Sequence, residues 1–321
     1  MILLFLRNII RLLTIQSLRI MRKISLALLF VCGILVSFTA GMQYPRGDVN
    51  YDGKVSIGDV SCLIDYLLNG EWPDEPVAPE EPINETFTVQ GVTFTMVGVK
   101  CGTFLMGGTE EQGTDVTSSE LPVREVTLSK NFSIGQTEVT QALWVAVMGS
   151  NPSYFSPVSG YPNDLRRPVE QVSWNDCQEF ISRLNGLTGR TFRLPTEAEW
   201  EFAARGGVMS LGYKYSGSNN LDEVGWYNGN SNSVPQPVGT KAPNELGLYD
   251  MSGNVYEWVE DWYNTYPDEP QTDPVCTEGS IPYRVTRSGS SGGTPKYSRV
   301  SYRGVSQPES ANLILGLRLA M

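Results

Sequence analysis

The sequence predicts an α+β fold rich in loops, with short strands and about three helices in its large domain. Glycine fills 32 and proline 20 of the 321 positions, more than average usage, which favours turns over a helical bundle. Short alternating segments at 87–89 and 92–97 indicate strands separated by glycine-rich turns. The chain is long enough for one large domain or two ordinary ones.

Three segments combine an N-cap residue with apolar residues at helical spacing, and each predicts a helix. They run from Thr140 to Gly149, from Ser173 to Leu184, and from Thr196 to Gly207. In the second and third, an acidic residue follows three positions after the cap, which is the pattern of a capping box. Little periodicity follows after Gly207, so long loops are expected there.

The composition excludes several kinds of chemistry. The chain contains no histidine, which rules out Ser-His-Asp and Cys-His catalysis and histidine-ligated zinc or iron. Its net charge of −11 argues against nucleic acid as a partner. Any reaction must therefore depend on carboxylates, cysteines, hydroxyls or a metal held by oxygen.

The first 41 residues have the pattern of a secretory signal peptide. Arg22 and Lys23 precede an apolar run from Ile24 to Phe38, and small residues follow. Met21 is an alternative start, which would make the preceding stretch an over-extended beginning. We expect the protein to be exported, whether secreted, periplasmic or at the cell surface, with no permanent membrane span. A retained membrane anchor is the alternative.

The cysteines do not form a metal-binding pattern. Of five, one lies in the leader, and the other four are widely spaced without a Cys-x-x-Cys pair, which disfavours zinc or iron–sulfur sites. Two disulfides or buried thiols are both compatible with this spacing.

Oxygen-bearing side chains between 48 and 59 have the spacing of a calcium-binding loop around Gly53. The predicted ligands are Asp48, Asn50, Asp52, Lys54 through its carbonyl, Ser56 and Asp59. An apolar helical pattern follows, so the module spans 46–70. This segment resembles a single dockerin type I repeat, an EF-hand-like half-module. The resemblance implies calcium and a cohesin-like partner in a polysaccharide-degrading assembly. Proline and glutamate dominate 71–85, which predicts an extended linker.

A second candidate metal site lies in 247–258. Asp250 and Glu257 stand seven residues apart with Gly253 between them, so their carboxylates converge if the chain loops around a cation. In the alternative interpretation Asp250 caps a turn and Glu257 is merely exposed. The aromatic segment 258–266 is either a ligand platform or part of a buried core, and the core is the commoner outcome.

Five segments in order resemble the sulfatase-modifying-factor family, whose namesake is the formylglycine-generating enzyme. They are 138–141, 172–176, 193–207, 247–258 and 315–318. The resemblance covers 86–321 and implies a C-type-lectin-like fold with little regular structure and bound calcium. It assigns this calcium to the side chains of Asp250 and Glu257 and to the carbonyls of Gly253 and Val255.

The family's oxidase members bind copper through two cysteines five positions apart and convert a substrate cysteine to formylglycine. Alignment on 284–290 places these positions at Gly293 and Ser298, and Ser290 matches a serine near the family's active centre. Because thiolates are the ligands that select Cu(I), copper is not expected here.

The prediction is a secreted calcium-binding protein with a non-catalytic binding or scaffold domain for a peptide or glycan. One alternative is a formylglycine-generating oxidase with an altered site. The other is a component of a polysaccharide-degrading assembly that docks through the dockerin-like repeat.

Overall fold

The computed structural model describes residues 81–321. The chain divides into two units, Met1–Pro79 and Glu80–Met321, and the elements below belong to the second. The predicted signal peptide (1–41), the dockerin-like calcium loop (46–70) and most of the linker therefore lie outside the described residues.

An antiparallel sheet opens the described part of the chain. Its strands are β1 (Glu85–Val89), β2 (Val92–Val99) and β5 (Phe132–Gly135), in that order. Gln90 and Gly91 connect β1 to β2 with φ angles of 48° and 83°. A two-residue hairpin of this kind needs a positive φ at both positions, which glycine adopts without strain.

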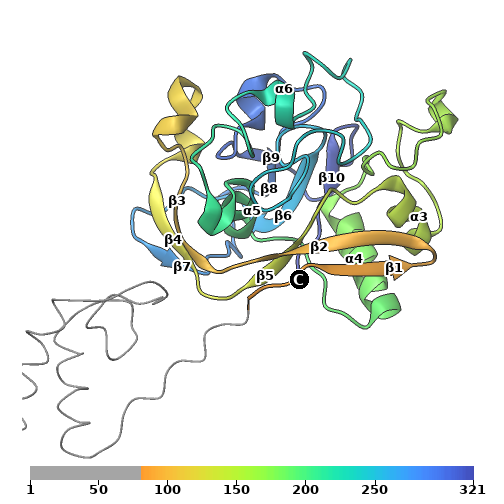
Figure 1. The fold of residues 1–321 in the computed structure, drawn as a ribbon, viewed down its shortest axis with the longest axis horizontal. Helices are drawn as coiled ribbons and strands as arrows, with labels where there is room; N and C mark the ends of the chain where they lie inside the picture. Colours follow the sequence, from red (N-terminus) through yellow and green to blue (C-terminus); the bar gives the residue numbers. More distant parts are fainter. Residues whose placement is uncertain (1–80) are drawn as a thin grey trace, which may run out of the picture. The chain divides into compact units, whose positions relative to one another are not determined.

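Two helices pack near this sheet and enclose the first core (Figure 1). They are α3 (Gln141–Met148) and α4 (Trp174–Thr188), and the sequence predicted both. The Thr140 side chain accepts a hydrogen bond from the Leu143 amide at the start of α3. Between the helices, the rings of Trp144 and Phe180 stack with their centroids 4.8 Å apart. This packing fixes the segment between β5 and α3, which carries Glu138.

The second core surrounds a helix that is buried along its whole length. α5 (Glu197–Ala204) begins after Thr196, as predicted, and none of its eight residues is exposed. A three-stranded sheet of β3 (Gly102–Met106), β4 (Arg124–Leu128) and β7 (Gln271–Thr272) contacts it on one side. In this sheet β3 and β4 are antiparallel, whereas β4 and β7 are parallel.

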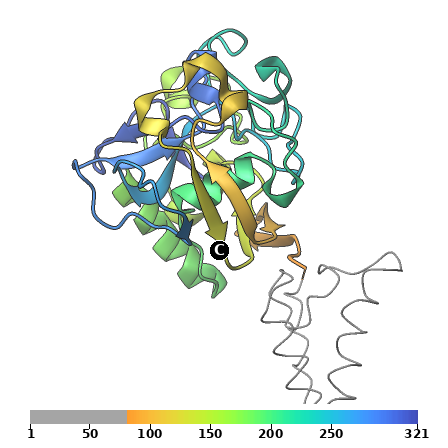
Figure 2. The same ribbon diagram turned by 90° about the vertical axis from the view of Figure 1, so that its left-hand side faces the viewer.

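The third sheet occupies the centre of the domain (Figure 2). Its strand order is β10 (Leu315–Leu317), β6 (Tyr256–Trp262), β8 (Arg284–Arg287) and β9 (Gly304–Ser306). β10 runs parallel to β6, and the remaining pairs are antiparallel. Just beyond β10, Ala320 forms bridges with Ile134 and Arg193, so the end of the chain joins the first sheet to the rest.

Short helical turns and loops complete the domain. The turns are η1 (Glu110–Asp115), η2 (Ser118–Glu120), η3 (Pro157–Ser159), η4 (Gly207–Met209), α6 (Leu221–Val224) and η5 (Pro295–Ser298). Mixed sheets with few helices and many loops confirm the α+β prediction. Within residues 81–321, no helix has the length and apolar character needed to span a membrane.

Candidate functional site

Three carboxylates and one guanidinium meet in the interior of the domain, and we call them the acid-rich cluster. They are Glu138, Asp250, Glu257 and Arg318, and none is more than 2% exposed. They come from four places in the fold: the segment before α3, the loop before β6, β6 itself, and the residue after β10. The folded chain therefore buries more negative than positive charge at this point.

Glu257 is the member of the cluster with a full set of partners. Its Oε1 accepts from Arg318 Nη2 at 2.7 Å, and its Oε2 accepts from Arg318 Nε at 2.9 Å and from Trp200 Nε1 at 2.6 Å. Arg318 also donates to the carbonyls of Gly135 and Tyr249, each at 2.8 Å. Glu257 is fully buried, so the alternative in which it is merely exposed is wrong.

Glu138 and Asp250 make no ion pair with any residue of 81–321. The Glu138 carboxylate accepts from the Asn254 side-chain amide at 2.7 Å and from the Val255 amide at 3.1 Å. Asp250 Oδ2 accepts from the Gly239 amide at 2.7 Å, whereas Asp250 Oδ1 is buried without a hydrogen-bond partner. Burial, together with the charges of Asp250 and Glu257, raises the pKa of Glu138 well above its ordinary value. Burial also raises the pKa of Asp250 to about 6.

The cluster fits a cation in charge and only partly in geometry. Asp250 offers a free oxygen, but both oxygens of Glu257 are already hydrogen-bonded. The Gly253 carbonyl accepts from Ser288 Oγ at 2.9 Å, and Val255 follows on the same loop. Among residues 81–321, no three acidic or cysteine side chains are placed to hold a metal ion together. The structure thus places Asp250 and Glu257 close enough for their charges to interact, with Glu257 hydrogen-bonded to Arg318.

A second group of buried charges is balanced, and we call it the paired network: Glu197, Glu201, Arg287 and Arg303. Arg303 Nε and Nη2 donate to Glu197 at 2.6 and 2.8 Å, and Arg287 donates to Glu201. Burial alone would raise the pKa of Glu197, but Arg303 and Arg287 hold it below its ordinary value. Each carboxylate in this network faces a guanidinium.

Gly293 and Ser298 lie in a crowded region of small residues beside the acid-rich cluster. Ser298 is fully buried, and its hydroxyl has no hydrogen-bond partner. A Cβ built at Gly293 would lie 3.3 Å from the Ser290 carbonyl oxygen, closer than an ordinary contact. Ser290 is 2% exposed, and its carbonyl accepts from the Gly293 amide at 2.9 Å. In the same stretch, the Ser288 carbonyl accepts from the Gly253 amide, which joins this region to the loop before β6.

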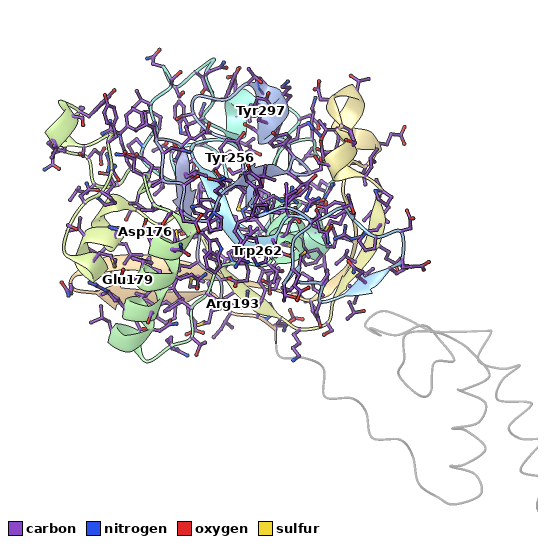
Figure 3. The ribbon with its side chains drawn as sticks, turned by 180° about the vertical axis from the view of Figure 1, so that it is seen from behind. Asp176, Glu179, Arg193, Tyr256, Trp262 and Tyr297 are labelled. Atoms are coloured by element: carbon purple, nitrogen blue, oxygen red, sulfur yellow. The ribbon has the colours of Figure 1, made fainter. Side chains whose placement is uncertain are left out.

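The cysteines in the described part of the chain lie elsewhere and are unpaired. Cys177 is buried in the first core, on α4. In Figure 3, Asp176 and Glu179 of this helix lie at the lower left of the domain, and Tyr297, the neighbour of Ser298, lies at its top. Cys101 follows β2. Cys276 lies between β7 and β8, and its amide donates to Asp261 of β6. The three atoms nearest to a Cβ built at Gly293 all belong to Ser290.

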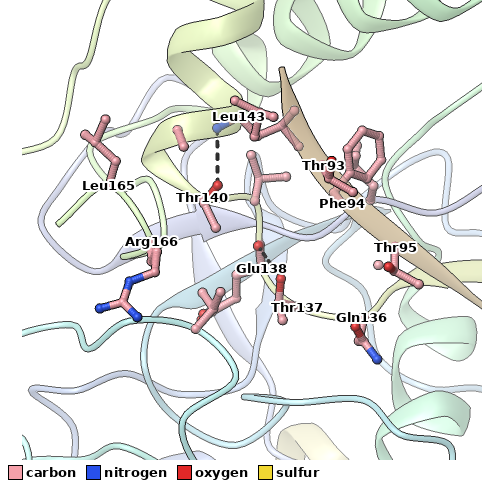
Figure 4. Close-up of a pocket in the computed structure, with 16 residues that line it drawn as sticks. Thr93, Phe94, Thr95, Gln136, Thr137, Glu138, Thr140, Leu143, Leu165 and Arg166 are labelled. Atoms are coloured by element: carbon pink, nitrogen blue, oxygen red, sulfur yellow. Dashed lines mark hydrogen bonds between the residues drawn. The ribbon is translucent and has the colours of Figure 1, made fainter. Parts of the chain in front are cut away.

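A cavity of about 340 Å³ opens beside Glu138 (Figure 4). Phe94 and Thr95 of β2 contribute to its wall, and so do Thr140 at the start of α3 and Arg166. It has both apolar and polar walls and a buried carboxyl group at its inner side. Such a cavity is a candidate place for a small ligand group.

Sequence reasoning assigned neither Glu138 nor Arg318 to the site. Both lie in segments that carry the family resemblance, at 138–141 and 315–318. These segments were the only sequence signal that could have indicated Glu138 and Arg318 as site residues. That the two residues lie near Asp250 and Glu257 depends on the tertiary fold. The aromatic residues Trp258 and Tyr266 are buried, as the core interpretation of 258–266 expected.

Comparison with known proteins relates the described domain to one family. Residues 83–321 match the family described as "Sulfatase-modifying factor enzyme 1-like domain" (FGE-sulfatase). The chain is 33% identical to "Chaperone protein LppX" of Paenibacillus barcinonensis over 61% of this chain and 81% of that protein. It is 34% identical to the "Formylglycine-generating enzyme" of Streptomyces coelicolor over 55% of this chain and 60% of that protein.

Among solved structures, "Treponema denticola variable protein 1" superposes with a TM-score of 0.66 at 34% identity. The match covers 74% of this chain and 99% of that chain. Its extent agrees with that of the family match, so both comparisons concern the described domain.

Proposed function

Because the chain belongs to the FGE-sulfatase family, the sulfatase-modifying factor enzyme 1-like domains, we propose that it is an exported, calcium-stabilised binding module without oxidase activity. Family membership alone leaves the activity open. One relative at 33% identity is named a chaperone and another at 34% is named the formylglycine-generating enzyme. Function therefore has to be argued from the residues at the site.

The observation that carries the proposal is the pair Gly293 and Ser298 at the positions of the copper-binding cysteines. Glycine offers no side chain, and a serine hydroxyl is a hard oxygen ligand, whereas Cu(I) prefers soft sulfur ligands. Cys101, Cys177 and Cys276 lie on other elements, so none of them replaces the missing thiols. A fold that keeps its core while its metal ligands change is suited to binding without redox chemistry.

The proposed ligand is a peptide or a glycan. Loops held between three sheets supply polar side chains on a rigid support, and the cavity beside Glu138 gives such a ligand a place to enter (Figure 4). Binding sites are commonly built on loops that a rigid scaffold positions.

Calcium is proposed at two places. In the described domain, Asp250 and Glu257 with the carbonyls of Gly253 and Val255 would hold it, and the unpartnered Asp250 Oδ1 supports this assignment. Calcium bound there would neutralise part of the excess charge of the acid-rich cluster. The predicted loop at 48–59 is the other place, and it rests on its sequence pattern.

Aerobic incubation with copper and a Cys-x-Pro-x-Arg peptide tests the absence of oxidase activity. Mass spectrometry is expected to find the peptide thiol unchanged, while the Streptomyces coelicolor formylglycine-generating enzyme converts it under the same conditions. Conversion of the peptide at an appreciable rate would overturn the proposal and favour the oxidase alternative.

Calcium is tested separately by thermal unfolding of the full chain with calcium and with a chelator. Calcium is expected to raise the midpoint, since a ligand that binds only the folded state stabilises it. The same midpoint in both conditions would remove calcium from the proposal.

A further inference from the structure

A cavity of about 420 Å³ lies on the domain away from the acid-rich cluster. Its walls come from the first residue of β4, from the loop that connects β6 to β7 and continues toward β8, and from Arg303. None of its lining residues belongs to the acid-rich cluster or to the Gly293 and Ser298 region. The described function therefore does not use this cavity.

One side chain in its wall is a buried guanidinium that makes no ion pair within residues 81–321, although the charge of Glu197 in the same wall acts on it. Arg124 is 7% exposed and makes no ion pair with any residue in 81–321. Its Nε and Nη1 have no hydrogen-bond partner, and Nη2 reaches only the sulfur of Met106 at 3.7 Å. The guanidinium carbon lies 3.6 Å from the centre of the Tyr266 ring. Because buried charges are normally paired, this arrangement is incomplete without an acceptor.

Arg303 provides an internal comparison at the same cavity. Its guanidinium carbon lies 4.0 Å from the Tyr266 ring centre, so two arginines contact one aromatic ring. Unlike Arg124, it donates to both oxygens of Glu197 and to the carbonyls of Ser119 and Asn264. Of these two arginines, Arg124 is the one whose Nε–H and Nη1–H lack an acceptor within residues 81–321, because Arg303 occupies both oxygens of Glu197.

The walls also limit the kind of anion. Glu197, Asp261 and Glu278 line the cavity together with Arg124 and Arg303, so a ligand with two negative charges would meet more repulsion than one with a single charge. Amide and hydroxyl side chains line it as well, from Asn264, Gln271 and Thr277. These groups can both donate and accept hydrogen bonds, which suits a ligand with several hydroxyl groups.

We propose that this cavity binds a small hydroxylated monocarboxylate, such as a sugar acid, and that Arg124 is the partner of its carboxylate. A carboxylate oxygen would accept the hydrogen bonds that Arg124 Nε and Nη1 now lack, and charge-assisted bonds of this kind are strong. The inference rests on the proposed binding function and gives it a ligand class at a defined place.

Titration calorimetry of the purified full chain with D-glucuronate tests the proposal, with D-glucose as the uncharged analogue. Glucuronate is expected to bind at one site, and glucose at least tenfold more weakly. In Arg124→Met, the affinity for glucuronate is expected to fall at least tenfold. The matched control is Arg183→Met, at an exposed arginine paired with Glu179 and outside both cavities, which should bind glucuronate as the wild type does.

Two further measurements keep the test decisive. Thermal unfolding should show that Arg124→Met is folded, because methionine keeps an apolar contact with the Tyr266 ring on which Arg124 stacks. If this variant does not fold, NMR of the wild type tests the proposal instead, through the side-chain Nε–H signal of Arg124. Glucuronate should shift that signal and glucose should not.

Several results would overturn the proposal. They are equal binding of glucuronate and glucose, no binding of glucuronate, unchanged binding in folded Arg124→Met, and inorganic phosphate binding more tightly than glucuronate. Oxidation of the Cys-x-Pro-x-Arg peptide would instead contradict the absence of oxidase activity, so the two failures are distinguishable.

Discussion

The acid-rich cluster and the paired network are both buried, but they balance their charges differently. In the paired network, Glu197 and Glu201 each face an arginine. In the acid-rich cluster, Glu138, Asp250 and Glu257 share Arg318 alone. An uncompensated buried charge destabilises a fold unless a ligand or a proton neutralises it. The balanced charges of the paired network therefore suit a structural role, whereas the excess negative charge of the acid-rich cluster suits the binding of a cation.

Removing one charge from the paired network should have the largest effect. Glu201→Gln removes the carboxylate that pairs with both Arg287 and Arg205 and leaves Arg287 only Glu197, at 3.5 Å; breaking a buried pair costs about 3–5 kcal/mol of unfolding free energy. Urea unfolding measures this loss. The matched control is Glu179→Gln, at an exposed pair with Arg183, where the expected loss is under about 0.5 kcal/mol. Equal losses of unfolding free energy in the two variants would contradict the claim that the buried pair stabilises the fold more than the exposed pair does.

Glu170 extends the comparison to a buried carboxylate that makes no ion pair with the described residues. Its Oε1 accepts from the Phe155 amide at 2.9 Å, its Oε2 has no partner, and burial raises its pKa to about 7. The folded protein therefore binds this proton more tightly than the unfolded chain does. The resulting stability is complete below the ordinary glutamate pKa near 4.3 and is lost as the pH rises through about 7.

Glu170→Gln should remove this pH dependence. Relative to the wild type, the variant should gain on the order of 2 kcal/mol of unfolding free energy between pH 5 and pH 8. Denaturant unfolding at both pH values measures the gain. A constant difference between variant and wild type would show that Glu170 does not titrate in this range.

Asp250→Asn tests the excess negative charge of the acid-rich cluster, and its expected change in unfolding free energy is the smallest of the three. In chelator, the variant should be about 1 kcal/mol more stable than the wild type at pH 8, because the amide removes a buried negative charge. The Asn carbonyl oxygen can still accept from the Gly239 amide, and asparagine tolerates the φ of 57° at this position.

Calcium should reverse the order of these two proteins, since the variant loses a proposed ligand. Thermal unfolding with chelator and with calcium measures both effects. If Asp250→Asn is less stable than the wild type in chelator, the acid-rich cluster does not carry a destabilising excess of negative charge. A calcium shift equal to that of the wild type would remove Asp250 from the proposed calcium site.

The starts of the three helices were predictable because their signals are local, whereas α4 extends to Thr188, beyond the predicted Leu184, and α5 already ends at Ala204. The caps at Thr140, Ser173 and Thr196 lie within three residues of the amides that they bind, so the sequence shows them directly. β6 was not predicted as a strand, because Tyr256–Trp262 includes consecutive buried residues on both faces. Such a strand lacks the alternation that identifies a half-exposed one.

The partners within the site could not be predicted, because they are distant in the sequence. Glu257 and Arg318 are 61 residues apart, and Glu201 and Arg287 are 86 apart. No pattern along the chain indicates which arginine reaches which carboxylate. Asp250 and Glu257 were found because they share one short motif. The unpaired state of Arg124 depends on side chains from several elements and is visible only in three dimensions.

The central claim is that the family fold is retained here without the copper site, and anaerobic Cu(I) titration tests it most directly. The purified full chain competes for Cu(I) with a chromogenic chelator, and the variant Cys101→Ser/Cys276→Ser controls for partly exposed thiols. We predict that the wild type takes up no more copper than its remaining thiols account for, and that the serine variant takes up less. One tightly held equivalent of copper in both proteins would contradict the claim.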